Sequence, residues 1–136
     1  MDTETDILAR TLYGEARGED LKGIEAVAAV ILNRVRYAAA GGPRWWGRTV
    51  REVCLKPAQF SCWNAADPNR VKLTGDLADD PVFAICRRVA VRAIKGILPD
   101  PTHGATHYHA LSVNPRWASA LIPTAQIGNH LFYTCL

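Results

Sequence analysis

The stretch Gly14-Glu15-Ala16-Arg17-Gly18-Glu19 lies where one helical pattern ends and another begins. A carboxylate between two glycines, at the end of an apolar segment, can be held rigidly and still face a cleft. A carboxyl group placed in this way is a candidate general acid and base if burial raises its pKa toward the working pH. The same letters also suit a solvated helix end, so the rest of the chain must distinguish the two interpretations.

Length and composition favour one folded domain over residues 1–136. Hydrophobic residues make up 49% of the chain, enough for a core without metal or disulfide staples. The formal net charge of +3 biases the chain only mildly toward anionic partners. No run approaches the roughly 20 apolar residues of a membrane-spanning helix. We therefore expect a monomer with no stable membrane insertion, no nucleic-acid partner and no cofactor.

The chain start and the cysteines bear on the compartment. Residues 1–6 are acidic and lack the basic-then-apolar order of a secretory signal, so we expect export by another route, a cytoplasmic protein, or a trimmed chain. The four cysteines form no CxxC pair, which disfavours a cysteine zinc site, and their spacing leaves three disulfide pairings open. We expect Cys86 to be a buried thiol on an apolar helical face; the others are Cys54, Cys62 and Cys135.

Apolar spacing and capping residues predict three longer helices and a few short strands. The helices are expected over residues 5–16, from the Asp20 cap to about Tyr37, and from Asp80-Pro81 to Gly96, with a short helix between Thr49 and Lys56. Residues 59–64 look extended, residues 65–79 look like loop, and strands are expected over residues 105–110, 125–127 and 130–135. This pattern predicts a mainly helical α+β domain with a small antiparallel sheet.

Glu15 and Glu19 are four residues apart, so a continuous helix would place them on one face. Retaining glycosidases use two carboxyl groups about 5–5.5 Å apart. Gly18, however, argues against a continuous helix between the two residues. Glu19 then has an alternative role as an acid beside the dipole of the second helix.

Three histidines within seven residues suggest a metal site, with His107 and His109 on one face of a strand and His103 nearby. No acidic or cysteine ligand lies at the usual close spacing. We therefore favour a polar groove in which these histidines line the wall together with Thr106 and Tyr108.

Residues 59–64 combine aromatic rings with neutral amide and hydroxyl groups, a mixture that suits a sugar chain as well as an ordinary strand. Trp45 and Trp46 either stack on sugar or clamp their loop to the core. A basic stripe, Arg88, Arg92 and Lys95, admits contact with nucleic-acid phosphates, but we interpret it as the solvated side of an amphipathic helix.

Several segments in order resemble the catalytic domain of spore cortex-lytic enzymes, the SleB-type cell wall hydrolases. The segments are residues 12–19, 27–35, 59–64, 104–109 and 127–133. The resemblance implies a compact, lysozyme-like fold and a lytic transglycosylase. Such an enzyme cleaves peptidoglycan between N-acetylmuramic acid and N-acetylglucosamine and leaves a 1,6-anhydro sugar. Where the spore enzymes have a Tyr-Tyr-Asn-Pro segment this chain has His107-Tyr108-His109, so a preference for cortex muramic lactam is not implied.

The resemblance implies that Glu15 is the catalytic acid and that no metal is needed. We expect the glycan to be bound by Glu19, Gln59, Phe60, Ser61, Trp63, Thr106, His107, Tyr108 and His109. The chain is expected to act at the cell wall, in periplasm or spore cortex, or as part of a phage or gene-transfer particle. The alternatives are a hydrolytic muramidase with Glu19 as second carboxylate, a zinc-dependent wall amidase or peptidase using the histidines, and a non-catalytic glycan-binding module.

Overall fold

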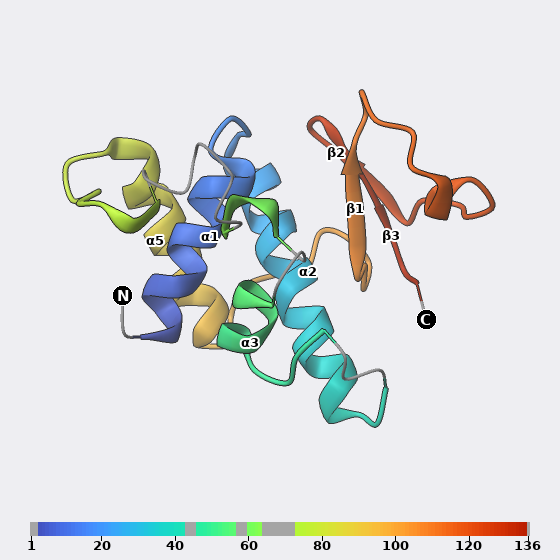
Figure 1. The fold of residues 1–136 in the computed structure, drawn as a ribbon, viewed down its shortest axis with the longest axis horizontal. Coiled ribbons are helices and arrows are strands. Elements are labelled where there is room, and N and C mark those ends of the chain that lie inside the picture. Colours follow the sequence, from blue (N-terminus) through green and yellow to red (C-terminus); the bar gives the residue numbers. More distant parts are fainter. Residues whose placement is uncertain (1–2, 43–45, 57–59, 64–72, 136) are drawn as a thin grey trace.

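The computed structural model describes residues 3–42, 46–56, 60–63 and 73–135, with a group of helices beside a small sheet (Figure 1). The elements are α1 (Glu4–Ala16), α2 (Leu21–Ala39), α3 (Val50–Leu55), the 3-10 turn η1 (Ser61–Trp63), α5 (Pro81–Ile94), β1 (His107–Ala110), the 3-10 turn η2 (Arg116–Ala118), β2 (Ala125–Ile127) and β3 (His130–Tyr133). The predicted α+β class is confirmed. No helix in the described residues is long and apolar enough to cross a membrane.

Short polar side chains begin the helices by accepting hydrogen bonds from free backbone amides of the first turn. Asp20 accepts from the Gly23 amide at 3.0 Å, and Thr49 accepts from the Glu52 amide at 3.1 Å. Asp80 accepts from two amides, and proline follows it at the first helical position. These three predicted starts are confirmed, because the signals are local to the sequence.

Helix α2 is shared between two hydrophobic cores. The larger core joins it to α1, α3 and α5, whereas Ala26 and Val30 belong to a smaller core with Phe132 of β3. Apolar residues at helical spacing from Leu21 to Val35 predict only one buried stripe on this helix. In the structure Leu21 is 51% exposed, while Ala26 and Val30 are fully buried on the second face. A helix between two layers is apolar on both sides, so a single-stripe pattern described it incompletely.

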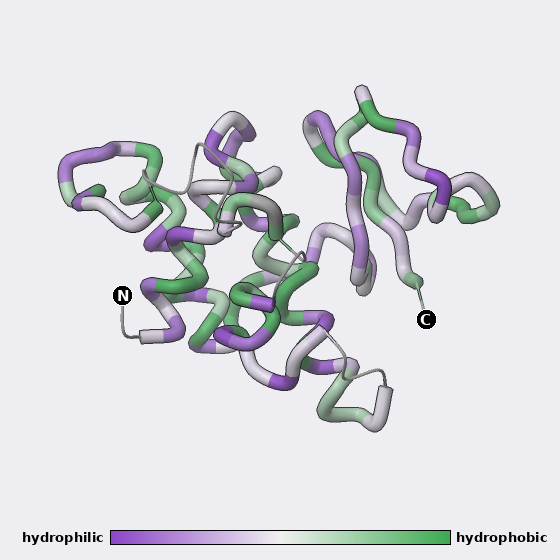
Figure 2. Tube along the Cα trace, viewed as in Figure 1, coloured by the Kyte–Doolittle hydropathy of each residue, from purple (hydrophilic) through white to green (hydrophobic). Residues whose placement is uncertain are grey.

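The sheet is antiparallel with the order β1-β3-β2, and β2 and β3 form the hairpin that the sequence predicted at Gly128-Asn129. Its middle strand presents Phe132 to α2, fully buried, and burial of a side chain of this size contributes about 1.5–3 kcal/mol. Strand β1 is mainly hydrophilic (Figure 2), although it lies against this core. A strand with polar side chains next to a core is where a site is expected.

The prediction that residues 59–64 are extended is wrong for the described part, since Ser61–Trp63 form the 3-10 turn η1. The Trp63 amide donates to the Phe60 carbonyl at 3.1 Å, and its indole donates to the Thr11 hydroxyl of α1 at 2.8 Å. Aromatic residues that would suit a strand are used here to fasten a tight turn to a helix.

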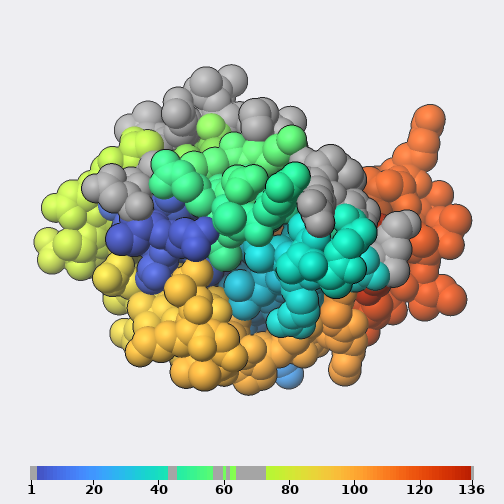
Figure 3. Space-filling model, turned by 90° about the horizontal axis from the view of Figure 1, so that it is seen from below, coloured from blue at the N-terminus to red at the C-terminus, as the bar shows by residue number. Residues whose placement is uncertain are grey.

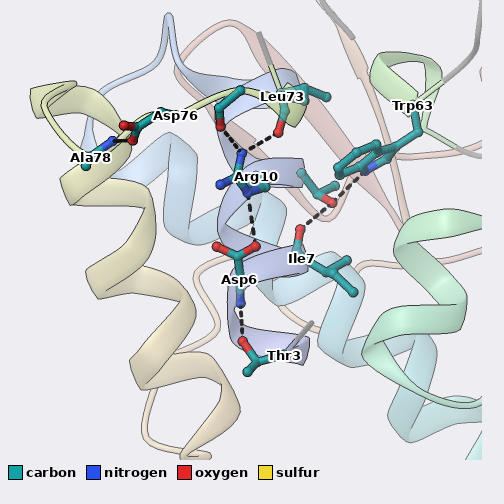
Figure 4. A network of polar contacts seen from close by, with 10 residues as sticks. Thr3, Asp6, Ile7, Arg10, Trp63, Leu73, Asp76 and Ala78 are labelled. Atoms are coloured by element: carbon teal, nitrogen blue, oxygen red, sulfur yellow. Dashed lines mark hydrogen bonds and ion pairs between the residues drawn. The ribbon is translucent and has the colours of Figure 1, made fainter. Parts of the chain in front are cut away.

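A network of polar contacts joins segments that are distant in the sequence to α1 (Figure 4). The Arg10 guanidinium donates to the carbonyls of Leu73 and Gly75 at 2.5 and 2.7 Å, and to the Asp6 carboxylate at 3.0 Å. With Trp63 on Thr11, these contacts fix the surroundings of the last turn of α1, which carries Glu15.

Candidate active site

Glu15 lies in the last turn of α1 and is partly exposed. The glycine before it is required by packing: a Cβ at Gly14 would lie 2.6 Å from the Cβ of Cys62 in η1. At Gly18 a Cβ would meet nothing within 4 Å. The two glycines of the motif therefore differ, because only Gly14 lets a second segment approach the helix closely.

Tyr108 of β1 binds the carboxylate of Glu15 from the sheet. Its hydroxyl donates to Oε1 at 2.8 Å, across 93 positions of sequence. Burial, reinforced by the charge of Glu15, holds the pKa of Tyr108 well above its ordinary value, so the phenol stays protonated. Among the described residues, Oε2 of Glu15 accepts no hydrogen bond. One carboxylate oxygen is thus fixed and the other is available.

Asn33 and Arg34 of α2 support the start of β1, and sequence reasoning did not single them out. Asn33 donates to Asp100 and to the Ala105 carbonyl at 3.0 and 2.9 Å, and Arg34 donates to the Thr106 carbonyl at 2.7 Å. The signal was present: an amide and a guanidinium follow the apolar run of residues 26–32 within the helix. A buried polar group needs a partner, and here the partners position Tyr108.

The Arg34 guanidinium is buried between the rings of Trp46 and Phe60, with its central carbon 5.7 and 5.4 Å from their centroids. Burial lowers its pKa, while the nearby Tyr108 and Glu15 act in the opposite direction. Arg34 therefore brings positive charge to the side of the site that contains Glu15.

Glu19 is engaged in a different contact from Glu15. Its two oxygens accept from the backbone and side-chain amides of Asn129, each at 3.0 Å, and Oε1 lies 3.3 Å from Nδ1 of His130. The backbone hydrogen bond from Asn129 is the main cause that lowers the pKa of Glu19. Because α1 ends at Ala16, the two carboxylates share no helix face, and Glu19 ties the α1–α2 turn to the β2–β3 hairpin.

His107 and His109 lie on the sheet face opposite Tyr108. Both rings contact Trp117, at centroid distances of 5.5 and 5.6 Å, and His109 also shares a hydrogen bond of 2.8 Å with the Tyr133 hydroxyl. Burial, and then the charge of Arg34, lowers the pKa of His107 to about 4. Across the described residues, no group of three His, Cys, Asp or Glu side chains is placed to hold a metal ion. The zinc alternative thus has no cluster of ligands in this part of the chain.

The remaining predicted site residues are mostly packed rather than open. Phe60 and Thr106 are buried, and Trp63 is half-buried against α1. Trp46 is buried with its indole donating to the Arg34 carbonyl at 3.0 Å, so it clamps its loop to the core. Gln59, Asn64 and Trp45, and the side chain of Ser61, lie outside what the structure describes.

The geometry, a helix-end acid held by a tyrosine from a small sheet, can be compared with known proteins. A family model described as "Cell Wall Hydrolase" matches residues 18–133. The chain belongs to the cell wall hydrolase family. Glu15 lies just before the matched residues, so its assignment rests on the motif and on the geometry above.

Solved structures of the family share this fold. The catalytic domain of Bacillus cereus SleB is 28% identical and superposes with a TM-score of 0.74, covering 96% of this chain and 89% of that one. The catalytic domain of the germination-specific lytic transglycosylase SleB from Bacillus anthracis is 30% identical with a TM-score of 0.73, covering 98% and 96%. The predicted family and the predicted fold are both confirmed.

Further relatives are described as spore cortex-lytic enzymes. The spore cortex-lytic enzyme of Halalkalibacterium halodurans is 31% identical over 132 residues, which are 96% of this chain and 34% of that protein. The spore cortex-lytic enzyme of Bacillus subtilis is 28% identical, over 93% of this chain and 36% of that protein. The chain therefore spans little more than a third of these relatives' length.

Proposed function

We propose that this chain cleaves the glycan strands of peptidoglycan as a lytic transglycosylase, with Glu15 as both acid and base. The observation that carries the proposal is the setting of Glu15: Tyr108 binds Oε1, and Oε2 accepts no hydrogen bond from the described residues. Family membership and the name of the Bacillus anthracis relative support the reaction class.

The chemistry needs one carboxyl group in two successive roles. Glu15 first donates its proton to the glycosidic oxygen between N-acetylmuramic acid and N-acetylglucosamine, and the bond from that oxygen to C1 breaks. The 6-hydroxyl of the same muramic acid then attacks the electron-poor C1, and its proton goes to the Glu15 carboxylate. The atoms balance without water, and the enzyme returns to its starting protonation state.

Tyr108 and Arg34 assist through position and charge. The Tyr108 hydroxyl keeps the carboxylate from rotating, and it continues to donate when Glu15 is ionised. Arg34 supplies a buried positive charge that favours the ionised carboxylate after the first proton transfer. In the proposal, the histidines and the buried Thr106 support the sheet rather than contact the glycan.

The hydrolytic alternative needs a second carboxylate or a positioned water. Glu19 was the candidate, but both of its oxygens are used by Asn129 and His130. Glu19 is therefore a poor second carboxylate for hydrolysis, which supports the proposed attack by the sugar's own hydroxyl.

The test is mass spectrometry of purified peptidoglycan digested with wild-type chain, Glu15→Gln and Glu19→Gln. We expect the wild type to release products ending in anhydro-muramic acid, lighter by one water than reducing-end products. Glu15→Gln should lose activity on the order of 100- to 10,000-fold, whereas Glu19→Gln should still form anhydro products. Reducing-end products would contradict the transglycosylase, and cleaved amide bonds would move the chemistry away from Glu15.

A further inference from the structure

Helix α5 and the residues after it are rich in positive charge, of which Arg92 is balanced by an ion pair with Glu25. From Pro81 to Pro99 there are four basic residues and no acidic one, against a formal net charge of +3 for the whole chain. Arg87 and Arg88 are exposed, and neither has a hydrogen bond or ion pair among the described residues. A surface of this kind attracts anionic groups, because its positive charges add to one local potential.

Two hollows border these arginines. One, of about 480 Å³, is lined by Ala84, Arg87, Arg88, Val91 and Arg92. The other, of about 300 Å³, is lined by Leu21, Ile85, Arg88, Val89 and Arg92. Arg88 and Arg92 belong to both, so the hollows form one groove with aliphatic walls and guanidinium groups along it. We call it the α5 groove.

Arg92 provides an independent sign that the groove is incomplete. Its guanidinium forms an ion pair with Glu25 of α2, which fixes the side chain in place. Its Nε is nevertheless buried and has no hydrogen-bond partner among the residues that the structure describes. A buried donor without an acceptor is costly, so the surroundings of Arg92 are not fully satisfied by the described residues.

The groove is formed on α5, whereas Tyr108 of the candidate active site belongs to the sheet. Helix α5 packs on α1 and α2, and the sheet with Tyr108 lies on the other side of these helices (Figure 1). From below, α5 and the segment that follows it form a continuous part of the surface, coloured yellow to orange (Figure 3). A ligand here would hold the protein on its substrate without entering the reaction.

Exposed guanidinium groups beside aliphatic walls suit carboxylates that are joined to small apolar side chains. Peptidoglycan offers this chemistry in its stem peptides, which combine free carboxylates with alanine methyl groups. We propose that the α5 groove binds the stem peptides of peptidoglycan, so that this chain acts on peptide-bearing wall glycan. The inference rests on the proposed function for its substrate, but it adds a second binding surface with its own ligand.

The test compares the affinity of the chain for glycan oligomers of matched length, with and without their stem peptides. Arg87→Gln/Arg88→Gln should bind the peptide-bearing oligomer roughly five-fold more weakly than the wild type, and the peptide-free oligomer equally well. The matched control is Arg48→Gln/Arg51→Gln, which removes the same charge from two other exposed positions and should leave both affinities unchanged. All binding is measured in the Glu15→Gln background, so that the oligomers stay intact.

Equal affinities of the groove variant and the control for the peptide-bearing oligomer would overturn the proposal. So would a groove effect seen only with wall material that carries phosphodiester polymers, since the anion would then be a phosphate. The proposed function is read separately, from anhydro products made by chains with an intact Glu15. If the peptide-free oligomer is cleaved but peptides add nothing to binding, only the groove assignment fails.

Discussion

Glu15 and Glu19 show how two identical side chains in one motif acquire different roles. Glu15 has one oxygen held by Tyr108 and one available, whereas Glu19 uses both oxygens on Asn129 and His130. A carboxylate saturated with hydrogen bonds is stabilised in its charged form and is a poor proton donor. The partners therefore distinguish the candidate acid from the structural acid.

Replacing Tyr108 with Phe should lower kcat about 10- to 100-fold while the chain remains folded. A hydrogen bond to a charged group contributes about 1.5–3 kcal/mol, which corresponds to that range of rate if the bond holds the carboxylate for reaction. The measurement is the rate of anhydro-product release at saturating peptidoglycan. Tyr133→Phe is the control, since it loses a hydroxyl that contacts His109 on the other sheet face. Equal rates for the two variants would contradict the positioning role.

The stability of the chain should fall as the pH drops from about 6.5 to about 4, in part because of His107. Its pKa is lowered from 6.5 to about 4 in the folded state by burial, so between these values the unfolded chain binds more protons. The unfolding free energy then rises with pH through this window and levels off above it. His107→Gln should show a shallower slope of unfolding free energy in urea over the same pH range. If the slope of unfolding free energy against pH is the same in the variant, His107 is not held in its neutral form by burial.

At the scale of elements, close approach and bridging hydrogen bonds position the acid. Helix α1 meets η1 at Gly14, and α2 meets β1 through Asn33 and Arg34. These contacts set the relative position of a helix end and a strand that are not neighbours along the chain. The site is consequently sensitive to substitutions that touch neither Glu15 nor the glycan.

Gly14→Ala should destabilise the chain by about 1–3 kcal/mol and reduce activity, because its Cβ would lie 2.6 Å from the Cβ of Cys62. Gly18→Ala is the matched control, with open space around the added carbon and an expected effect near zero or slightly stabilising. Urea unfolding of both variants checks the expectation. Similar losses in the two would mean that the close approach of η1 to α1 is not what limits this position.

For the whole molecule, α2 joins two cores, so the helices and the sheet should unfold together. The thiols report on the larger core. Cys54 and Cys86 are fully buried, which raises the pKa of each to about 12, and Cys62 is buried in the same core. Cys135 is half-buried near the end of the chain, and all four cysteines are thiols rather than disulfides.

In the native state Cys135, which is only half-buried, should react with a thiol reagent before the other cysteines, although burial raises its pKa as well. The other three should react only as fast as the chain opens, because a buried thiol is neither ionised nor accessible. Mass spectrometry of the labelled chain over time gives the count and the sites. Cys135→Ser should remove the early label, and rapid labelling of Cys54 or Cys86 in that variant would contradict a single closed core.

The sequence by itself determined the helices, their caps and the β2–β3 hairpin, and the motif indicated Glu15 as the candidate acid. These features follow from local signals: apolar spacing, an N-cap at Asp20, proline after Asp80, and Gly128-Asn129 in a turn. The resemblance to the family predicted the fold correctly because it also rests on local segments, which occur in the same order along the chain.

Only the tertiary structure decided which side chains form hydrogen bonds with the two glutamates. Tyr108 is 93 residues from Glu15, and Asn129 is 110 residues from Glu19, so no local pattern states which side chains meet. It also turned an expected extended segment into η1, buried Thr106 and Phe60, and gave Arg34 a place beside the acid. The physical reason is that buried polar groups take hydrogen-bond partners from segments distant in the sequence. Those segments come together only when the helices and the sheet pack against each other.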